Sequence, residues 1–270
     1  MMMHFPTRTG PTMSIHHAAD GYDSQDIADT YARGRPDYPA ALDGWLRDTL
    51  GLHSVSTVLD LGAGTGKFTP RLLATGARVV AVEPVQAMRE KLHATFAHVQ
   101  ALDGSADAIP LPDASLDAVV CAQSFHWFAT AQALAEIRRV LKPGGCLGLV
   151  WNMRDNSVPW VARLDALVNH YEGDTPRYYT GAWRSVFPCP GFGPLQASHL
   201  SNGHTGNPEA VIVDRVRSTS FIASLPSPQR DALTAQVREL IASEPLLAGK
   251  AEVTVPYTTA AFCAVKTETP

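Results

Sequence analysis

Three glycines mark a bend in the stretch LDLGAGTGKFT, residues 59–69. Gly62, Gly64 and Gly66 follow an apolar run, and a helix-like pattern begins near Lys67. Glycine permits positive φ and lets a ligand approach the main chain closely. The N–H groups at the start of the following helix add oriented hydrogen-bond donors. The bend is therefore a candidate ligand site.

Two common nucleotide motifs fit this bend poorly. A phosphate-binding loop needs four residues between its glycines and then Lys and Ser/Thr, but Gly62 and Gly66 enclose three residues. Phe68 stands where the hydroxyl residue belongs, and Lys67 stands where a GxGxxG dinucleotide motif needs its third glycine. The GxGxG spacing instead suits a nucleoside that carries an amino-acid tail.

Two further residues could do chemistry near this bend. Glu83 ends the apolar run 79–84, about twenty residues after the glycines, and a carboxylate there can accept both hydroxyls of a ribose. His126 lies in SFHWF, just after another apolar run, and an imidazole can act as a base or donate a hydrogen bond. The alternative for His126, which stands beside Trp127 and Phe128, is an ordinary core histidine.

Alternating strand and helix patterns must position these residues. Buried strands are predicted over 79–84, 116–122 and 146–151, and the helical pattern of 131–141 is stopped by KPGG. This alternation implies right-handed crossovers and a parallel, doubly wound α/β sheet.

The alternation ends after Trp151. Helices are predicted over 158–171 and 227–243, the second with Ser227 as N-cap and Pro228 at its first position. The expected organisation is a mobile tail (1–20), a core with an N-terminal cap (21–151), a lid with one sheet strand (152–250) and a C-terminal strand closing the sheet edge (251–270).

Composition excludes several classes of partner. The net charge of the 270-residue chain is −4 without Lys/Arg clusters, which argues against nucleic acid and anionic membranes. No apolar run approaches the roughly 18–20 residues of a membrane span, and the N-terminus lacks the apolar core of a secretory signal. The four cysteines lie far apart without zinc-ligand spacing, so we expect reduced thiols, no metal site and a cytoplasmic protein.

The ordered motifs resemble those of class I S-adenosylmethionine-dependent methyltransferases. The motifs, which span about residues 22–152, are VLDLGAGTGKFT, VVAVEP, GSADAIPLPDASLDAVVCAQSFHWF, EIRRVLKPGG and LGLVWN. YARGRPDYP (31–39) and FHWF make the chain similar to the trans-aconitate methyltransferase-like branch, whose acceptors are small acids or related metabolites. The resemblance implies a mostly parallel seven-stranded sheet with its last strand antiparallel, and a helical lid insertion.

The resemblance also implies a binding site for S-adenosylmethionine. Its methionine moiety would lie against the bend and its ribose against Glu83, while Gln123 would pass beneath the sulfonium. Related sequences often carry Asp at the position of Ser105, so which of Ser105, Ala106 or Asp107 contacts the adenine stays open. The cap would bring Arg35 to the cofactor carboxylate, although Arg35 could equally pair with a surface acid. The residues assigned to the cofactor are Tyr31, Arg35, Asp60, Gly62, Ala63, Gly64, Gly66, Glu83, Pro84, Ser105, Ala106 and Gln123.

The acceptor is expected beyond the methyl group. His126 is assigned as base or positioner, and Trp127, Trp151 and Arg217 as further acceptor residues, with an arginine of the segment 215–225 holding an anionic substrate. The expected reaction is methylation of an oxygen of a small carboxylic acid or hydroxylated metabolite. Methylation of a natural-product intermediate at N or C, a nicotinamide-dependent oxidoreductase and a non-catalytic cofactor-binding protein stay open, as does the choice between monomer and homodimer.

Overall fold

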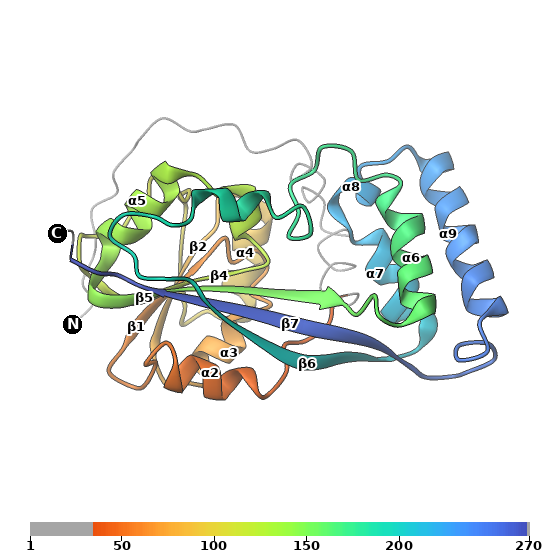
Figure 1. The fold of residues 1–270 in the computed structure, drawn as a ribbon, viewed down its shortest axis with the longest axis horizontal. Coiled ribbons are helices and arrows are strands. Elements are labelled where there is room, and N and C mark those ends of the chain that lie inside the picture. Colours follow the sequence, from red (N-terminus) through yellow and green to blue (C-terminus); the bar gives the residue numbers. More distant parts are fainter. Residues whose placement is uncertain (1–34, 269–270) are drawn as a thin grey trace.

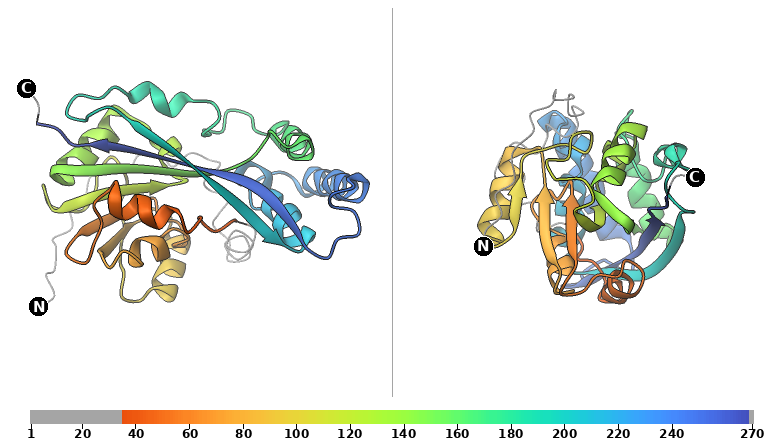
Figure 2. Two further views of the ribbon diagram at one scale, coloured as in Figure 1. Left: turned by 60° about the horizontal axis from the view of Figure 1, so that its bottom comes forward. Right: turned by 90° about the vertical axis from the view of Figure 1, so that its left-hand side faces the viewer.

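The computed structural model describes residues 35–268, which form a seven-stranded sheet with helices on both faces (Figures 1 and 2). The strands are β1 (Thr57–Leu61), β2 (Arg78–Val82), β3 (Gln100–Leu102), β4 (Leu116–Ala122), β5 (Leu141–Arg154), β6 (Gln196–Gly206) and β7 (Val253–Val265). Their order is β3-β2-β1-β4-β5-β7-β6. Strands β1 to β5 are parallel, and β7 is antiparallel to both of its neighbours. The predicted fold class is confirmed.

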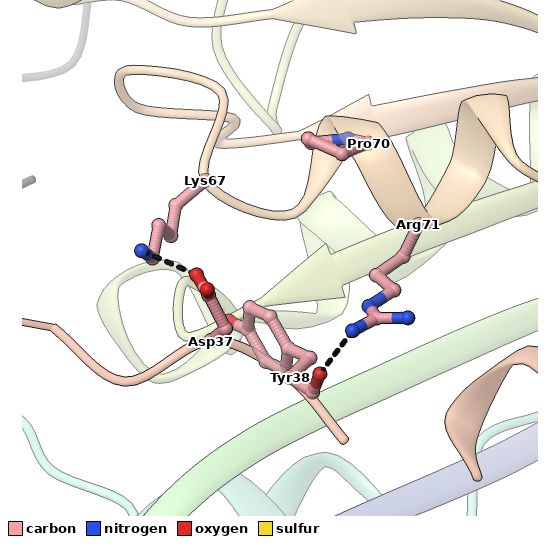
Figure 3. Close-up of a pocket in the computed structure, with 5 residues that line it drawn as sticks. All are labelled: Asp37, Tyr38, Lys67, Pro70 and Arg71. Atoms are coloured by element: carbon pink, nitrogen blue, oxygen red, sulfur yellow. Dashed lines mark hydrogen bonds and ion pairs between the residues drawn. The ribbon is translucent and has the colours of Figure 1, made fainter. Parts of the chain in front are cut away.

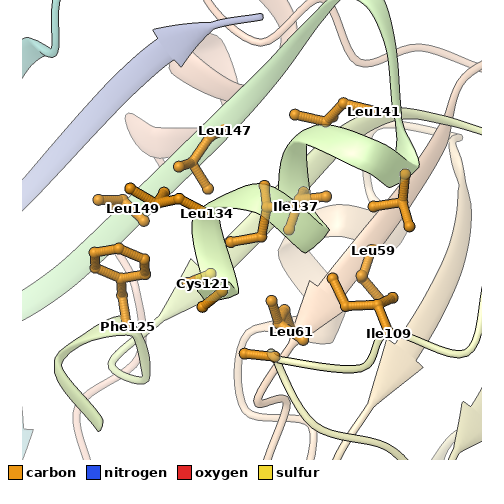
Figure 4. Close-up of a cluster of buried hydrophobic side chains, with 14 of the residues drawn as sticks. Leu59, Leu61, Ile109, Cys121, Phe125, Leu134, Ile137, Leu141, Leu147 and Leu149 are labelled. Carbon is orange, nitrogen blue, oxygen red and sulfur yellow. The ribbon is translucent and has the colours of Figure 1, made fainter. Parts of the chain in front are cut away.

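Strand β1 shows why the chain forms this layered sheet. Its side chains alternate between the two faces, so that Val58 belongs to one core and Leu59 and Leu61 to the other. The core around Leu59 is covered by α5 (Ala131–Val140), as Figure 4 shows. The opposite core is covered by α2 (Leu42–Asp48), α3 (Thr69–Leu73) and α4 (Gln86–Thr95). Apolar runs buried on both faces are what a doubly wound sheet requires.

The C-terminal strand does not lie at the sheet edge, contrary to expectation. Strand β7 pairs with β5 on one side and with β6 on the other, and β6 is the edge strand. The reason lies in the sequence of β6, QASHLSNGHTG, which is polar and half exposed and carries no apolar run. An edge strand needs only one covered face, so its pattern is weak.

Strands β5, β6 and β7 continue past the core and support a second group of helices. These distal helices are α6 (Pro159–Asn169), the π-helix η4 (Glu209–Asp214), α7 (Arg215–Arg217), α8 (Ser220–Ala223) and α9 (Ser227–Ser243). They lie at one end of the molecule in Figure 1 and pack in a third apolar cluster with the outer parts of β7. This arrangement accounts for the helices expected over 158–171 and 227–243.

The N-cap expected for the last helix is wrong by one residue. Pro226 occupies the N-cap position of α9, and Ser227 is its first helical residue. The Ser227 hydroxyl donates to Asp231, one turn further on, rather than capping a backbone N–H. Pro226 and Pro228 both have backbone angles that suit the start of a helix, which shifts the boundary.

Within residues 35–268, no helix is long and apolar enough to cross a membrane. The same residues contain no group of three or more His, Cys, Asp or Glu side chains arranged to hold a metal ion.

Candidate active site

The glycine bend connects β1 to α3 and has the predicted geometry. Gly62, Gly64 and Gly66 have φ of +69°, +59° and +84°. A Cβ at Gly62 would lie 2.7 Å from the Cβ of Ser124, and one at Gly66 would lie 2.9 Å from the ring of Phe96. At Gly64 a Cβ would meet only the Met88 sulfur, at 3.7 Å. The outer glycines therefore permit internal packing, while Gly64 leaves its main chain open to a ligand.

Glu83 is buried beside this bend, at the carboxyl end of β2. Its two carboxylate oxygens accept hydrogen bonds from the backbone nitrogens of Gly64, at 2.8 Å, and Val85, at 2.9 Å. Burial raises the pKa of Glu83, although both of these hydrogen bonds oppose the shift. Each oxygen keeps a free lone pair, so the carboxylate is positioned to accept further donors such as hydroxyls.

Asp60 offers a second buried carboxylate in β1. The hydroxyl of Thr69 donates to its Oδ2 at 2.8 Å, whereas its Oδ1 has no hydrogen-bond partner among the described residues. Burial raises the pKa of Asp60 to about 7, and the negative charge of Glu83 adds to the effect. An unpaired buried oxygen is costly, so this oxygen is matched to a donor such as the ammonium of an amino-acid tail.

The three side chains expected near an adenine differ in whether they are free to form a hydrogen bond with it. Ala106 is buried in the core, and Asp107 accepts a hydrogen bond from Thr130, the N-cap residue of α5. The hydroxyl of Ser105 has no hydrogen-bond partner within residues 35–268, and its residue is half-buried. Of the three candidates, Ser105 is therefore the side chain free to contact a base.

Gln123 has a structural role that its sequence does not reveal. It adopts a φ of +58°, unusual for a residue other than glycine, directly after β4. Its backbone N–H donates to the carbonyl of Val150 and its side-chain amide to the carbonyl of Asn152, both at 2.8 Å. The side-chain nitrogen is thus occupied in joining β4 to β5.

The segment around Asp37 crosses between the glycine bend and the distal helices. Asp37 forms an ion pair with Lys67 at 2.5 Å, and its carbonyl accepts hydrogen bonds from Asn152 and Asn202. Arg35 donates to the carbonyl of Ser218, between α7 and α8. Figure 3 shows a pocket of about 230 Å³ between this segment and the start of α3, lined by Asp37, Tyr38, Lys67, Pro70 and Arg71. Tyr31 lies outside the described residues, and the roles expected for this segment as a cap and for Arg35 as a cofactor ligand stay predictions.

His126 lies in the short helix η2 (Phe125–Trp127), after β4. Its Nδ1 accepts a hydrogen bond from the indole nitrogen of Trp151 at 3.1 Å. Burial lowers the pKa of His126 to about 3, and the positive charges of Arg177 and Arg35 contribute. His126 is therefore neutral at physiological pH.

The two tryptophans assigned to the acceptor have different surroundings. Trp127 is half-buried, with its ring centroid 5.2 Å from that of His126. Trp151 has no exposed surface and packs against Trp183, Tyr178 and Phe262, so it could touch an acceptor only if this packing opened, and its assignment stays a prediction. In β5 its side chain alternates toward the buried face, where only its indole N–H reaches His126.

Three arginines lie close together near the distal end of β5, and one of them, Arg177, acts on His126. Arg154 pairs with Asp165 at 2.9 Å, both almost fully buried, and Arg177 lies 3.8 Å from Glu172. Arg215 donates to the hydroxyl of Thr219, and no carboxylate of the described residues lies within ion-pair distance of it.

The three cations are close enough to act on one another. The pKa of Arg215 is lowered to about 10, chiefly by burial, and the charges of Arg35, Arg154 and Arg177 contribute to this shift. Arg154 Nη1, Arg177 Nη1, Arg215 Nε and the hydroxyl of Tyr257, which is paired in register with Arg154, are buried without hydrogen-bond partners in the described chain. We call Arg154, Arg177 and Arg215 the arginine cluster.

Arg217, assigned to the acceptor from the sequence, is not part of the arginine cluster, and its assignment stays a prediction. Its charge acts on Glu209, which forms an ion pair with Arg238 of α9. Arg215 belongs to the cluster instead, because residues two positions apart on a helix point to different sides. Arg154 and Arg177 were not predicted at all; the end of an extended β5 was the available signal for Arg154, and nothing in the sequence singled out Arg177.

Comparison with known proteins identifies the family to which the chain belongs. A family model described as a methyltransferase domain matches residues 59–149. An uncharacterized methyltransferase-like protein of Schizosaccharomyces pombe is 39% identical over 242 residues, 89% of this chain and 94% of that protein. An uncharacterized methyltransferase of Mycobacterium tuberculosis strain H37Rv is 41% identical over 229 residues, 85% and 89% of the two chains. The chain belongs to the class I S-adenosylmethionine-dependent methyltransferases.

The solved structures agree with the fold of this methyltransferase. A protein of Anaeromyxobacter dehalogenans assigned as a Type II methyltransferase has a TM-score of 0.63 at 25% identity, over 87% of this chain and 99% of its own. A phosphoethanolamine N-methyltransferase of Haemonchus contortus, solved with S-adenosylhomocysteine, has a TM-score of 0.54 at 16% identity, over 95% and 61% of the chains. The second likeness concerns the fold alone. The names of the relatives given above identify no acceptor for this enzyme.

The residues of the methyltransferase fit the cofactor. The main chain at Gly64 leaves room for the cofactor. The unpaired Oδ1 of Asp60 can accept a hydrogen bond from its ammonium, and the carboxylate of Glu83 can accept hydrogen bonds from its ribose hydroxyls. When bound, S-adenosylmethionine supplies an electrophilic methyl group. Together with Ala63, Gly66 and Pro84 in the same loops, these residues stay our candidates for holding it.

Proposed function

We propose that this methyltransferase methylates a carboxylate oxygen of a small organic acid. The observation that carries the proposal is the arginine cluster, which holds an excess of buried positive charge and includes Arg177, whose charge acts on His126. A hydroxylated metabolite is the second candidate, because the buried hydroxyl of Tyr257 could also pair with a neutral oxygen.

Charge balance favours an anionic acceptor. The three guanidiniums of the cluster face two carboxylates of the described chain, Asp165 and Glu172, and Arg35 adds a further positive charge that acts on Arg215. A buried charge without a counter-charge is strongly unfavourable, so a carboxylate entering the cluster would offset this cost. The unpaired nitrogens of Arg154, Arg177 and Arg215 are the donors that a carboxylate requires.

The surroundings favour orientation over proton transfer. A carboxylate is already ionised at neutral pH, so its methylation needs no general base; the protein has to hold it, orient it and exclude water. The guanidinium of Arg177 lies 5.1 Å from the ring centroid of Phe221 on α8, and this cation–π contact restricts the orientation of its N–H donors. These features support the cluster as an acceptor pocket at the carboxyl end of the sheet, where open α/β folds bind ligands.

The proposed setting is the cytoplasm. The chain is acidic overall, and its four cysteines are free thiols, three of them buried. Small organic acids rather than nucleic acids or membranes are therefore the acceptors that we propose.

An acceptor screen tests the proposal. The purified enzyme would be incubated with S-adenosylmethionine labelled on its methyl group and with mono-, di- and tricarboxylic acids, each paired with its corresponding alcohol or amide. We expect label in the acids only, in a product that releases methanol in mild alkali, as a methyl ester does. Alkali-stable label would show methylation at a hydroxyl, nitrogen or carbon and refute the proposal. Gly64→Arg is the control for enzyme-independent transfer.

A further inference from the structure

The hydrogen bond between Trp151 and His126 fixes which nitrogen of the imidazole carries a proton. An indole N–H can only donate, so Nδ1 of His126, 3.1 Å away, must be the acceptor and unprotonated. A neutral imidazole with a bare Nδ1 carries its hydrogen on Nε2. His126 is thereby held as a hydrogen-bond donor.

This tautomer excludes the role of general base for His126. Its Nε2 is already protonated, and Nδ1 could take a proton only by breaking the bond from Trp151. The nearby cations, Arg177 and Arg35, oppose an imidazolium in the same place.

We propose that Trp151 is a positioning residue that locks His126 as an Nε2–H donor toward an ionised oxygen of the acceptor. The acceptor part of this inference rests on the proposed function, whereas the tautomer part does not. His126 and the arginine cluster then form one set of hydrogen-bond donors for the acceptor carboxylate. His126 donates to one of its two oxygens, either the one that is methylated or the other.

The position of Trp151 explains why it suits this task. Its indole is held by Trp183 at a ring-centroid distance of 4.6 Å and by Tyr178 at 5.1 Å, and it has no exposed surface. The ring therefore has no room to turn its N–H elsewhere. A phenylalanine at position 151 would fill most of this space and remove only the donor.

Nuclear magnetic resonance of the free enzyme tests the tautomer directly. With ¹⁵N-labelled histidine, the ring signals of His126, identified by their loss in His126→Gln, should show a single Nε2–H tautomer between about pH 5 and 9. Trp151→Phe should give a mixture of tautomers. Trp45→Phe, which removes a buried indole on α2 in the opposite core, is the matched control and should leave the His126 signals unchanged.

Activity tests the role of the donor and does not depend on the folding of a Trp151 variant. Glutamine can present an N–H near the place of Nε2, so His126→Gln should keep at least a tenth of kcat, while His126→Ala should lose about 30-fold, the value of a hydrogen bond to a charged group.

Several results would overturn the proposal. These are an Nδ1–H or charged His126 in the wild type, an unchanged tautomer in Trp151→Phe, or equal loss of kcat in the two His126 variants. If no acid is methylated but the tautomer is as expected, the proposed function fails and the lock on His126 stands.

Discussion

One carboxylate oxygen of Glu83 accepts the backbone N–H of Gly64, across 19 residues of sequence and between the ends of two neighbouring strands. The bond joins the side chain proposed to hold the ribose to the loop proposed to hold the methionine. The two halves of the cofactor site are thus kept in one geometry.

Replacing Glu83 by alanine should weaken S-adenosylmethionine binding about 30-fold, because acceptors for two hydroxyls and the support of the Gly64 loop are lost together. Calorimetric titration measures the effect. Glu90→Ala is the control, since Glu90 is exposed on α4 and, within residues 35–268, pairs only with Gln86. Equal Kd values for the two variants would contradict the assignment of Glu83.

Gly62→Ala should lower the free energy of unfolding by more than Gly144→Ala. Both residues have positive φ, which costs a non-glycine residue about 1–2 kcal/mol. Only the new Cβ at position 62 would also meet Ser124, at 2.7 Å, whereas nothing lies within 4 Å at position 144. Urea denaturation would measure both variants, and equal losses would show that the loop adapts to the side chain.

Arg215→Met should raise KM for the acid acceptor at least tenfold and leave the Kd of S-adenosylmethionine unchanged. The apo enzyme should be no less stable, because the substitution removes a buried charge without a carboxylate partner. Arg217→Met is the matched control two residues away, near Glu209, and its KM should stay at the wild-type value. A KM change in Arg217→Met instead would return the acceptor role to that residue.

The contribution of Asp60 to the free energy of unfolding should fall as pH rises from about 4 to 7. The pKa of Asp60 is raised in the folded protein to about 7 from an ordinary 3.8, so the folded state binds more protons than the unfolded state between these values. Its contribution is complete below the lower pKa and decreases by up to about 1.4 kcal/mol for each pH unit above it. Glu83, whose pKa is also raised, acts in the same direction.

Urea denaturation of Asp60→Asn across this range would isolate the Asp60 contribution. The free energy of unfolding of the wild type minus that of the variant should decrease as pH rises from about 4 to 7. Parallel curves would mean that Asp60 ionises at its ordinary pKa in the folded state.

The cofactor half of the molecule could be predicted from sequence because its signals are local. The bend at Gly62–Gly66 and the acid at the end of β2 each follow a buried strand, and parallel strands bring their carboxyl ends together. The acceptor half could not be predicted in the same way. Arg154, Arg177 and Arg215 come from a strand, a loop and a short helix, and only the tertiary fold brings them together.

Trp151 shows a second limit of the sequence. A tryptophan in a buried strand has the same local pattern whether it lines a pocket or belongs to the core. Which one applies depends on Trp183 and Phe262, which lie far along the chain.

Strands β5 and β7 run without interruption from the core to the distal helices, which limits how substrate can enter and product can leave the enzyme. A hinged flap would have to bend three strands joined by a continuous ladder, from Cys146 and Val265 at one end to Arg154 and Tyr257 at the other. That cost makes the distal helices a fixed wall. We infer that substrate and product enter and leave beside the segment near Asp37. Its ion pair with Lys67 and its hydrogen bonds from Asn152 and Asn202 can break without disturbing the sheet.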